Sequence, residues 1–396
     1  MKILKVEDLH ADGGWRNLSF LKVTTDSGLV GWSEFSESRA APGLTAVIRK
    51  MAEMVIGQDP RAIGRLNASL RAATIATTGG IASQAIAAIE NACLDIKGKA
   101  LGVPVYDLFG GAIRDRLPLY WSHCGTFRVN DRKTFETHAG TPPLLTLDDV
   151  VCLGEEVVRG GYRALKTNIL VFDGTVPWNY RAGNGRGPGS PEANFSNHLA
   201  DAIKDLLSAF QQGVAGKAEL MLDLNFNFKP EGLKRIAKLV EPYNLLWLEA
   251  DLHDAQALAS IRQSTTTTIA SLENVYGLRA MLPFLEQGAV DIAIVDVQWN
   301  GFTEAMKLAS LADSYGINVA AHNYHGHLST LIGAHFAAAI PNFRIMEFDV
   351  DEMPRAKDLD THPLEIENGE LQVPNRPGWG TDVNEEMLKA HPPRHS

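Results

Sequence analysis

The sequence predicts an α/β fold, a (β/α)8-type TIM barrel with an N-terminal α+β capping domain that the C-terminal segment completes. The first observation is that six short apolar runs each end in an ionisable residue. The second is that these ends recur at nearly constant spacing, and the third is that the chain before them changes from strand-like to helical patterning. The six ends are Asp223, Glu249, Glu273, Asp296, His322 and Glu347.

The spacing of these ends indicates repeated βα units. Successive ends lie 26, 24, 23, 26 and 25 positions apart, enough for one strand, one helix and two short loops. Each run is apolar throughout, as expected of a buried parallel strand. In a (β/α)8 barrel the carboxyl ends of the strands form the catalytic face, so ionisable residues at six of them favour a barrel over a doubly wound sheet.

A lone acidic residue at a strand end is usually a helix N-cap or a solvated loop residue. Six in register are hard to explain in that way. Carboxylates gathered at a barrel mouth repel one another and lose hydration, which destabilises the fold unless a cation is present. We therefore expect Asp223, Glu249 and Glu273 to be neutralised by a bound group.

Residues 1–116 have the pattern of a separate capping domain. Residues 1–35 alternate as in a strand meander with a turn at 26–28, and helical spacing begins after Gly43. Helices are expected over about 44–56, 60–73 and 81–101, the last one ending near residues 102–104. A strand meander followed by helices predicts an α+β domain.

The barrel is expected over residues 117–350, with residues 351–396 returning to the cap. Its first strand would be LPLYWSHC, with Ser122, His123 and Cys124 at the exit. Its second would be GYRALKTN, with Lys166 and Asn168 at the exit. Both units are long: residues 125–146 are expected to form a flap, and the polar residues 172–198 a lid or specificity loop.

Composition excludes several classes of protein. The chain has 396 residues, 45% of them hydrophobic, which suffices for a large barrel and a smaller domain. Its net charge of −10 argues against a nucleic-acid partner. The first seven residues lack the apolar segment of a signal peptide, and residues 72–89 are too polar to span a bilayer. We expect a cytoplasmic, soluble protein without a membrane partner.

Three cysteines, Cys93, Cys124 and Cys152, show no metal-binding spacing. Their odd number fits a reducing compartment, and we expect all three to be small core residues.

Three carboxylates on neighbouring strand ends favour a hard cation with oxygen ligands. Mg²⁺ therefore fits Asp223, Glu249 and Glu273 better than Zn²⁺ does, and Mn²⁺ is a possible substitute. One cation on three strand ends leaves positions open for a bidentate substrate, such as a carboxylate with an α-hydroxyl.

Asp296 and His322 end neighbouring strands and form a candidate general base. A carboxylate beside an imidazole fixes its tautomer and raises its basicity. His123 at the first strand's exit is placed to bind a substrate hydroxyl or simply to pack. His325 and His327 are expected to lie beyond the strand end, with His322 alone acting as base.

The sequence resembles the enolase superfamily, mandelate racemase subgroup, over nearly its whole length. The resemblance rests on GLVGWSEF in the cap, on ENACLDIKGKALGVPVYDLFGGAIRDRLPLY, and on the strand ends LDLN, LEA, SLEN, AAHN and MEFD. It implies one Mg²⁺ per subunit on Asp223, Glu249 and Glu273, and a base dyad of Asp296 and His322. It also implies that Lys166 is the first lysine of a KxK motif and that Glu347, expected to be protonated, hydrogen-bonds a developing enediolate.

One departure from the subgroup decides the expected reaction. Asn168 stands where the racemases have a second lysine, and an amide does not accept a proton at neutral pH. This favours one-base chemistry: a lyase that removes the proton α to a carboxylate and eliminates water from an acid sugar, an aldonate or aldarate, to give a 2-keto-3-deoxy acid. His322 would take the α-proton and help the β-hydroxyl to leave.

Three alternatives stay open at this point. A racemase or epimerase of a 2-hydroxy acid would use His123 or a loop residue as its second base. Cycloisomerisation is disfavoured because related enzymes have a lysine where Asp296 stands. A barrel kept only for binding is disfavoured by the complete ligand set.

Substrate contacts are expected from both domains. The candidates are Asn168, Asn225, His123 and Trp15, the last in the cap loop around residues 13–20. The expected partners are a small acid sugar and further copies of the chain, as a homo-oligomer.

Overall fold

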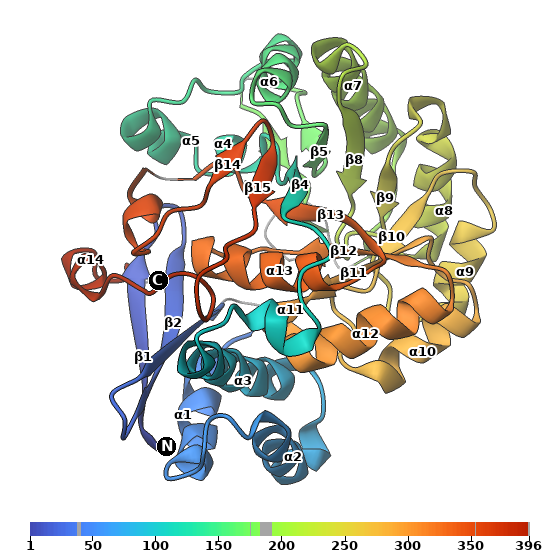
Figure 1. Ribbon diagram of the computed structural model, residues 1–396. Helices are drawn as coiled ribbons and strands as arrows, with labels where there is room; N and C mark the ends of the chain where they lie inside the picture. Colours follow the sequence, from blue (N-terminus) through green and yellow to red (C-terminus); the bar gives the residue numbers. More distant parts are fainter. Residues whose placement is uncertain (38–40, 175, 183–191, 353, 395–396) are drawn as a thin grey trace.

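The computed structural model describes residues 1–37, 41–174, 176–182, 192–352 and 354–394. Figure 1 shows a closed barrel of parallel strands with a smaller domain of strands and helices packed against it. The strand order is β4-β5-β8-β9-β10-β11-β12-β13, and β13 pairs with β4 to close the ring. The predicted eight-stranded barrel with an N-terminal α+β cap is confirmed.

The barrel strands are short and alternate with helices on the outside (Figure 1). The strands are β4 (Arg116–Trp121), β5 (Ala164–Thr167), β8 (Glu219–Asp223), β9 (Trp247–Glu249), β10 (Ile269–Ser271), β11 (Ile292–Asp296), β12 (Asn318–His322) and β13 (Phe343–Phe348). The helices are α6 (Leu147–Arg159), α7 (Asn197–Val214), α8 (Pro230–Leu239), α9 (Ala255–Arg262), α10 (Leu278–Glu286), α11 (Val297–Asn300), α12 (Phe302–Ser314) and α13 (His327–Ala339). A short turn, η5 (Glu241–Tyr243), precedes β9.

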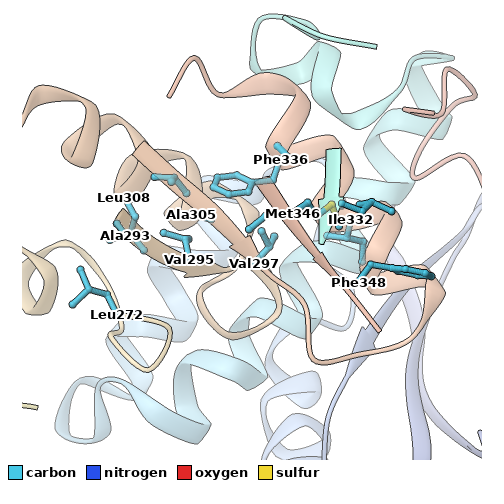
Figure 2. Packing of buried hydrophobic residues seen from close by; sticks show 14 of the residues in the cluster. Leu272, Ala293, Val295, Val297, Ala305, Leu308, Ile332, Phe336, Met346 and Phe348 are labelled. Carbon is cyan, nitrogen blue, oxygen red and sulfur yellow. The ribbon is translucent and has the colours of Figure 1, made fainter. Parts of the chain in front are cut away.

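Successive side chains of the barrel strands point alternately into and out of the barrel, and they belong to two separate apolar clusters. In β11, Ile292 and Ile294 belong to a cluster with Trp247 that fills the barrel, whereas Ala293 and Val295 belong to the larger core. Figure 2 shows Ala293 and Val295 near Leu308 of α12, and it shows Met346 of β13 near α13. Successive side chains of a strand point to opposite faces, so a continuous apolar run supplies both layers.

The cap consists of a three-stranded antiparallel sheet and three helices. Its strands are β1 (Ile3–Asp12), β2 (Asn17–Thr25) and β3 (Val30–Phe35); its helices are α1 (Leu44–Val55), α2 (Ile63–Ala73) and α3 (Gly80–Leu101), with short turns η1 (Ile75–Thr77) and η2 (Val105–Phe109). The three predicted helices are present. At Gly31 a Cβ atom would lie 2.1 Å from the Ala92 carbonyl oxygen, so the close packing of β3 on α3 requires glycine.

The C-terminal segment returns to the cap, as predicted. After η6 (Pro354–Asp358), the strands β14 (Ile366–Glu367) and β15 (Glu370–Gln372) form a hairpin, and β15 pairs with β4. The Trp379 indole then donates to the Trp32 carbonyl at 3.1 Å, and its backbone N–H donates to Asp95. The last helix, α14 (Glu385–Ala390), packs on β1 (Figure 1).

Glu34 of β3 ties the cap to the barrel. Its buried carboxylate accepts hydrogen bonds from the backbone N–H groups of Gly326 and Ser329, at the N-terminus of α13. An anion there is favoured by the helix dipole and by the free N–H groups of the first turn. The GWSEF sequence of the cap therefore fixes the loop between β12 and α13.

The first insertion is largely helical. Residues 125–146 contain α4 (Thr126–Asn130), α5 (Arg132–Thr134) and the turn η3 (Phe135–Ala139). Phe127 and Phe135 form a small apolar cluster with Trp15 of the cap packed against it. The expected flap is thus a packed element between the cap and the barrel.

The second insertion is only partly described. Its described ends contain β6 (Leu170–Val171) and β7 (Trp178–Asn179), which pair, while residue 175 and residues 183–191 of the expected lid lie outside the described part. Tyr180 and Phe195 are buried in the main core, and Tyr180 stacks on Phe228. These two aromatic residues dock the described ends of the segment on the barrel, and the lid or specificity role stays a prediction.

Cys93 and Cys124 are buried, but Cys152 is exposed on α6. The expectation of three core cysteines is wrong for Cys152 because it falls on the outer face of that helix. None of the described helices is long and apolar enough to cross a bilayer. The domain limits at 116/117 and 350/351 stay predictions.

Candidate active site

The two-residue period of the strands places the candidate side chains inside the barrel mouth. On seven strands a residue of the inner apolar cluster is followed two positions later by a buried polar residue. These pairs are Tyr120 and Ser122, Ala164 and Lys166, Met221 and Asp223, Trp247 and Glu249, Ile294 and Asp296, Ala320 and His322, and Ile345 and Glu347. The apolar filling of the barrel therefore forms the floor of a polar site.

Glu273 reaches the same site by a different route. It lies two residues beyond the end of β10, where Leu272 has a positive φ of 94° and packs in the outer core. A positive φ is strained for a leucine, and such strain is concentrated at functional sites. The Glu273 carboxylate lies 3.1 Å from Nε2 of His322 and accepts a hydrogen bond from Asn274.

Lys166 is the central cation of the site. Its Nζ lies 2.9 Å from Glu249, 3.0 Å from Glu347 and 3.6 Å from Asp223. Burial lowers the pKa of Lys166, but the surrounding carboxylates outweigh that effect and raise it well above its usual value. Lys166 is therefore charged, and it partly neutralises three of the acidic strand ends.

Glu347 makes two hydrogen bonds and two ion-pair contacts, the latter with Lys166 and His322. Ser122 donates to one oxygen, and the backbone N–H of Asn323 donates to the other at 2.9 Å. Burial raises the pKa of Glu347, but Lys166 and His322 outweigh burial and hold the pKa below its usual value. The expectation of a protonated Glu347 is thus wrong, because the neighbouring cations favour the carboxylate more strongly than desolvation opposes it.

His322 and Asp296 form the expected pair. Nδ1 of His322 lies 2.5 Å from Asp296, whose other oxygen accepts from the Trp299 backbone at 2.7 Å. Burial raises the pKa of Asp296, but hydrogen bonds to His322 and His325 lower it to about 2. Burial also lowers the pKa of His322, whereas Glu273, Glu347 and Asp296 raise it well above its usual value. The carboxylate thus fixes the ring orientation and leaves Nε2 facing the site.

A group of carboxylates suited to a cation lies beside Lys166. Oxygens of Glu249, Asp251 and Glu273 lie within 4.8 Å of one another. Oε1 of Glu249 and Oδ2 of Asp251 are buried without a hydrogen-bond partner in the described structure. Burial raises the pKa of both carboxyl groups well above the usual range. An oxygen-only donor set with unpartnered oxygens fits Mg²⁺.

Asp223 is near this group but is arranged differently from the sequence prediction. Its Oδ1 accepts from the backbone and the side chain of Asn225, at 2.8 and 2.9 Å, and its Oδ2 faces Lys166. Asp251 was missed by the sequence analysis. Its signal was an additional acid two positions after Glu249, directly following LEA.

Asn168 and Asn225 come together, with Nδ2 of Asn168 lying 3.4 Å from Oδ1 of Asn225. Asn168 also accepts a hydrogen bond from the Thr126 hydroxyl at 2.9 Å. Neither amide offers a titratable base. Both amides therefore lie at the ends of the strands that carry Lys166 and Asp223, and their role as substrate contacts stays a prediction.

His123 belongs to a second imidazole–carboxylate pair. Its Nδ1 lies 2.8 Å from Asp349, just beyond β13, and 3.1 Å from the Ser122 hydroxyl. Its backbone has a positive φ of 47°, which is uncommon for residues other than glycine. The ring contacts Phe127 and Tyr324, so His123 is both packed and held at the barrel mouth.

Trp15 and Arg16 bring the cap to the same mouth. Trp15 stacks on Phe127 with ring centroids 3.8 Å apart and donates to the Asp351 carbonyl. Arg16, which the sequence analysis missed, donates to the His325 carbonyl and lies 3.6 Å from Asp349. A cation following Trp15 in the cap loop was the available signal.

His325 and His327 lie beyond the strand end, as expected. Nε2 of His325 is 3.3 Å from Asp296, so one carboxylate contacts two imidazoles. His327 begins α13 and pairs with Glu352. Burial lowers the pKa of His327, but Glu352 raises it to about 9.

Comparison with known proteins identifies two family matches. Residues 14–110 match the mandelate racemase / muconate lactonizing enzyme N-terminal domain, and residues 150–387 match the enolase C-terminal domain-like family. The D-xylonate dehydratase of Haloferax volcanii is 32% identical over 98% of this chain and 89% of its own. The D-galactonate dehydratase of Ralstonia nicotianae is 26% identical over 98% of this chain and 94% of its own.

Among solved structures, a Burkholderia xenovorans protein is 44% identical with a TM-score of 0.96, covering 99% of this chain and 96% of its own. It is provisionally named an L-alanine-DL-glutamate epimerase and was solved with magnesium and fumarate. The family matches cover most of the chain, and both fall on the domains seen in the structure. The chain therefore belongs to the mandelate racemase/muconate lactonizing enzyme family of the enolase superfamily.

Proposed function

We propose that the protein is a Mg²⁺-dependent dehydratase of an acid sugar, an aldonate or aldarate, and that its product is a 2-keto-3-deoxy acid. The observation that carries the proposal is the asymmetry of the site. His322 is oriented by Asp296, whereas the place of the second lysine of the KxK motif is taken by Asn168, which has no basic group. The dehydratases of xylonate and galactonate among the relatives support the same reaction class.

The proposed cation ligands are Asp223, Glu249 and Glu273. The unpartnered, buried Oε1 of Glu249 and the carboxylates around it fit a hard cation. Bound Mg²⁺ would supply positive charge against the negative charge that develops on the substrate carboxylate. The magnesium in the Burkholderia xenovorans structure supports this choice of metal.

The residues of the chain would act as follows. Removing the proton α to a carboxylate adds a second negative charge to that group, and Lys166 is the charged side chain at the centre of the site. His322 in its neutral form would accept the α-proton at Nε2, and the proposed cation on Glu273 would oppose the positive charge that Glu273 otherwise favours on this ring. The same imidazolium can then give its proton to the β-hydroxyl, which leaves as water, and the resulting enol tautomerises to the 2-keto acid.

A second candidate is a racemase or epimerase of a 2-hydroxy acid with the same proton abstraction. The observation that favours it is the His123 and Asp349 pair, which resembles the His322 and Asp296 pair in composition. If His123 can reach the opposite face of the substrate, it would supply the second base that Asn168 lacks. The name of the Burkholderia xenovorans protein, an epimerase, also favours epimerisation, although the substrate that it names is not a 2-hydroxy acid.

A panel assay separates the two candidates. The enzyme is incubated with Mg²⁺ and a set of aldonates and aldarates, and 2-keto acid is measured together with optical rotation. Keto acid from at least one substrate, abolished by a chelator, is the result expected of a dehydratase. Altered rotation without keto acid would establish the epimerase instead.

A further inference from the structure

We propose that Asp251 is an additional carboxylate ligand of the cation, so that the metal site of this chain contains four acidic residues instead of three. The inference rests on the cation of the proposed function but not on the identity of the sugar. Asp251 follows β9 by two residues and is buried, with 3% of its surface exposed. One of its oxygens lies within 4.8 Å of an oxygen of Glu249 and of an oxygen of Glu273.

The orientation of Asp251 is fixed by Ser271. The Ser271 hydroxyl, at the end of the neighbouring strand β10, donates to Oδ1 of Asp251 at 2.8 Å. The other oxygen, Oδ2, is buried and has no hydrogen-bond partner among the described residues. Carboxylates that bind metals are commonly oriented in this way: one oxygen accepts a hydrogen bond from a neighbouring residue, and the other oxygen is left to contact the metal.

The charges around Asp251 require a cation that the described side chains do not supply. Lys166 contacts Glu249, Glu347 and Asp223, and within the described residues no ion pair forms to Asp251. Glu273 has His322 beside it. An unpaired buried carboxylate next to two others is costly, and a divalent cation relieves that cost for the whole group.

A fourth carboxylate also matches the coordination that the substrate needs. Mg²⁺ prefers octahedral coordination by oxygen. With four protein ligands, two positions remain, the number taken by a substrate carboxylate and its α-hydroxyl together. Four protein oxygens and two substrate oxygens would then fill all six positions, leaving none for water.

The experiment compares Asp251→Asn with Asp254→Asn in the full chain without substrate. Asp254 is exposed and caps α9, so its variant controls for the loss of one acidic side chain in the same loop. We expect titration calorimetry of the metal-free proteins to show Mg²⁺ binding at least about tenfold weaker in Asp251→Asn, because even outer partners of metal ligands are worth about 10–100-fold. Asp254→Asn should bind like the wild type.

Two further readouts separate a ligand from a structural residue. Bound Mn²⁺ should carry one more water in Asp251→Ala than in the wild type, measured by water-proton relaxation. Without metal, Asp251→Asn should melt no lower than the wild type, because the amide has the same shape and its oxygen can still accept from the Ser271 hydroxyl. A hydrogen-bond role alone would instead lower the metal-free melting temperature and leave the water count unchanged.

The outcomes also distinguish this inference from the proposed function. If the wild type binds Mg²⁺ and the Asp251 variants have the same affinity and the same number of bound waters, Asp251 is not a ligand. The dehydratase proposal would still stand. Absence of Mg²⁺ binding by the wild type would overturn both. Weaker binding with one additional water supports Asp251 as a ligand, whatever sugar is turned over.

Discussion

At the scale of single residues, each acidic strand end has a cation or a hydrogen-bond donor beside at least one of its oxygens, but some buried oxygens of the site have none. Lys166 and His322 form ion pairs with Glu347, and Asn225 donates a hydrogen bond to Asp223. The oxygens without a partner include one of Glu249 and one of Asp251. Those oxygens are available to the proposed cation, which makes metal binding the first property to test.

Replacing Glu249 with Gln should weaken Mg²⁺ binding by at least about tenfold, since one of the charges on the cation is lost. Titration calorimetry of the metal-free protein measures this. Glu286→Gln, at the exposed end of α10, is the matched control and should bind like the wild type. Equal Mg²⁺ affinities in the two variants would remove Glu249 from the ligand set.

His335 predicts a pH dependence of stability. It is fully buried in α13, accepts from the Tyr106 N–H, and has its pKa lowered by burial to about 3. Between about pH 6.5 and 3 the unfolded chain binds a proton that the folded chain does not. The free energy of unfolding should therefore fall as the pH falls, by up to about 1.4 kcal/mol per pH unit from this group.

Urea unfolding of the wild type and His335→Phe at pH 7.5 and 5.5 tests this. The variant should lose less stability between the two pH values, even if it starts lower because the Tyr106 hydrogen bond is gone. The exposed residue His362 offers the control His362→Phe, whose pH dependence should equal that of the wild type. Identical slopes for all three proteins would contradict a neutral, buried His335.

At the scale of elements, the contact of β3 with α13 fixes the cap against the loop between β12 and α13. The carboxylate of Glu34 holds the first turn of α13, and the same loop carries His325 against Asp296. A Cβ atom at Gly326 would lie 2.9 and 3.0 Å from the two oxygens of Glu34, so a larger residue there would displace this carboxylate from its hydrogen bonds. One side chain of the cap thus positions a barrel loop.

Glu34→Gln should lower the free energy of unfolding by about 1.5–3 kcal/mol, since the amide loses the charge and turns a donor toward a backbone N–H. Hydrogen exchange should increase at the amides of Gly326 and Ser329. Glu37→Gln is the control, because Glu37 accepts from Gly43 and Thr45 at the start of α1, inside the cap. Unchanged exchange at α13 in Glu34→Gln would show that the cap is held elsewhere.

At the scale of the whole molecule, spacing and periodicity predicted the barrel because each βα unit repeats the same local pattern. The cap and most mouth residues followed from alternation and from short motifs. Asp251 and Arg16 did not, since their position depends on loop geometry and on packing between domains that a strand pattern does not encode. The ionised state of Glu347 was missed because it depends on the distances to Lys166 and His322, which only the folded chain defines.

The long second insertion shows the same limit. Its polar composition predicted a lid or specificity loop and did not indicate that Tyr180 and Phe195 would join the main core. A few aromatic residues suffice to dock a polar segment when a preformed apolar surface lies beside it. The sequence shows the residues but not the surface they meet.

The central claim is that one base, His322, acts on one face of an acid sugar. The most direct test uses a sugar acid that the enzyme converts, together with its C2 epimer. Each is incubated with the enzyme in D₂O and followed by NMR. The account predicts α-proton exchange and 2-keto-3-deoxy acid from one epimer only, with both lost in His322→Asn. Exchange of both epimers by the wild type would contradict it and establish a second base.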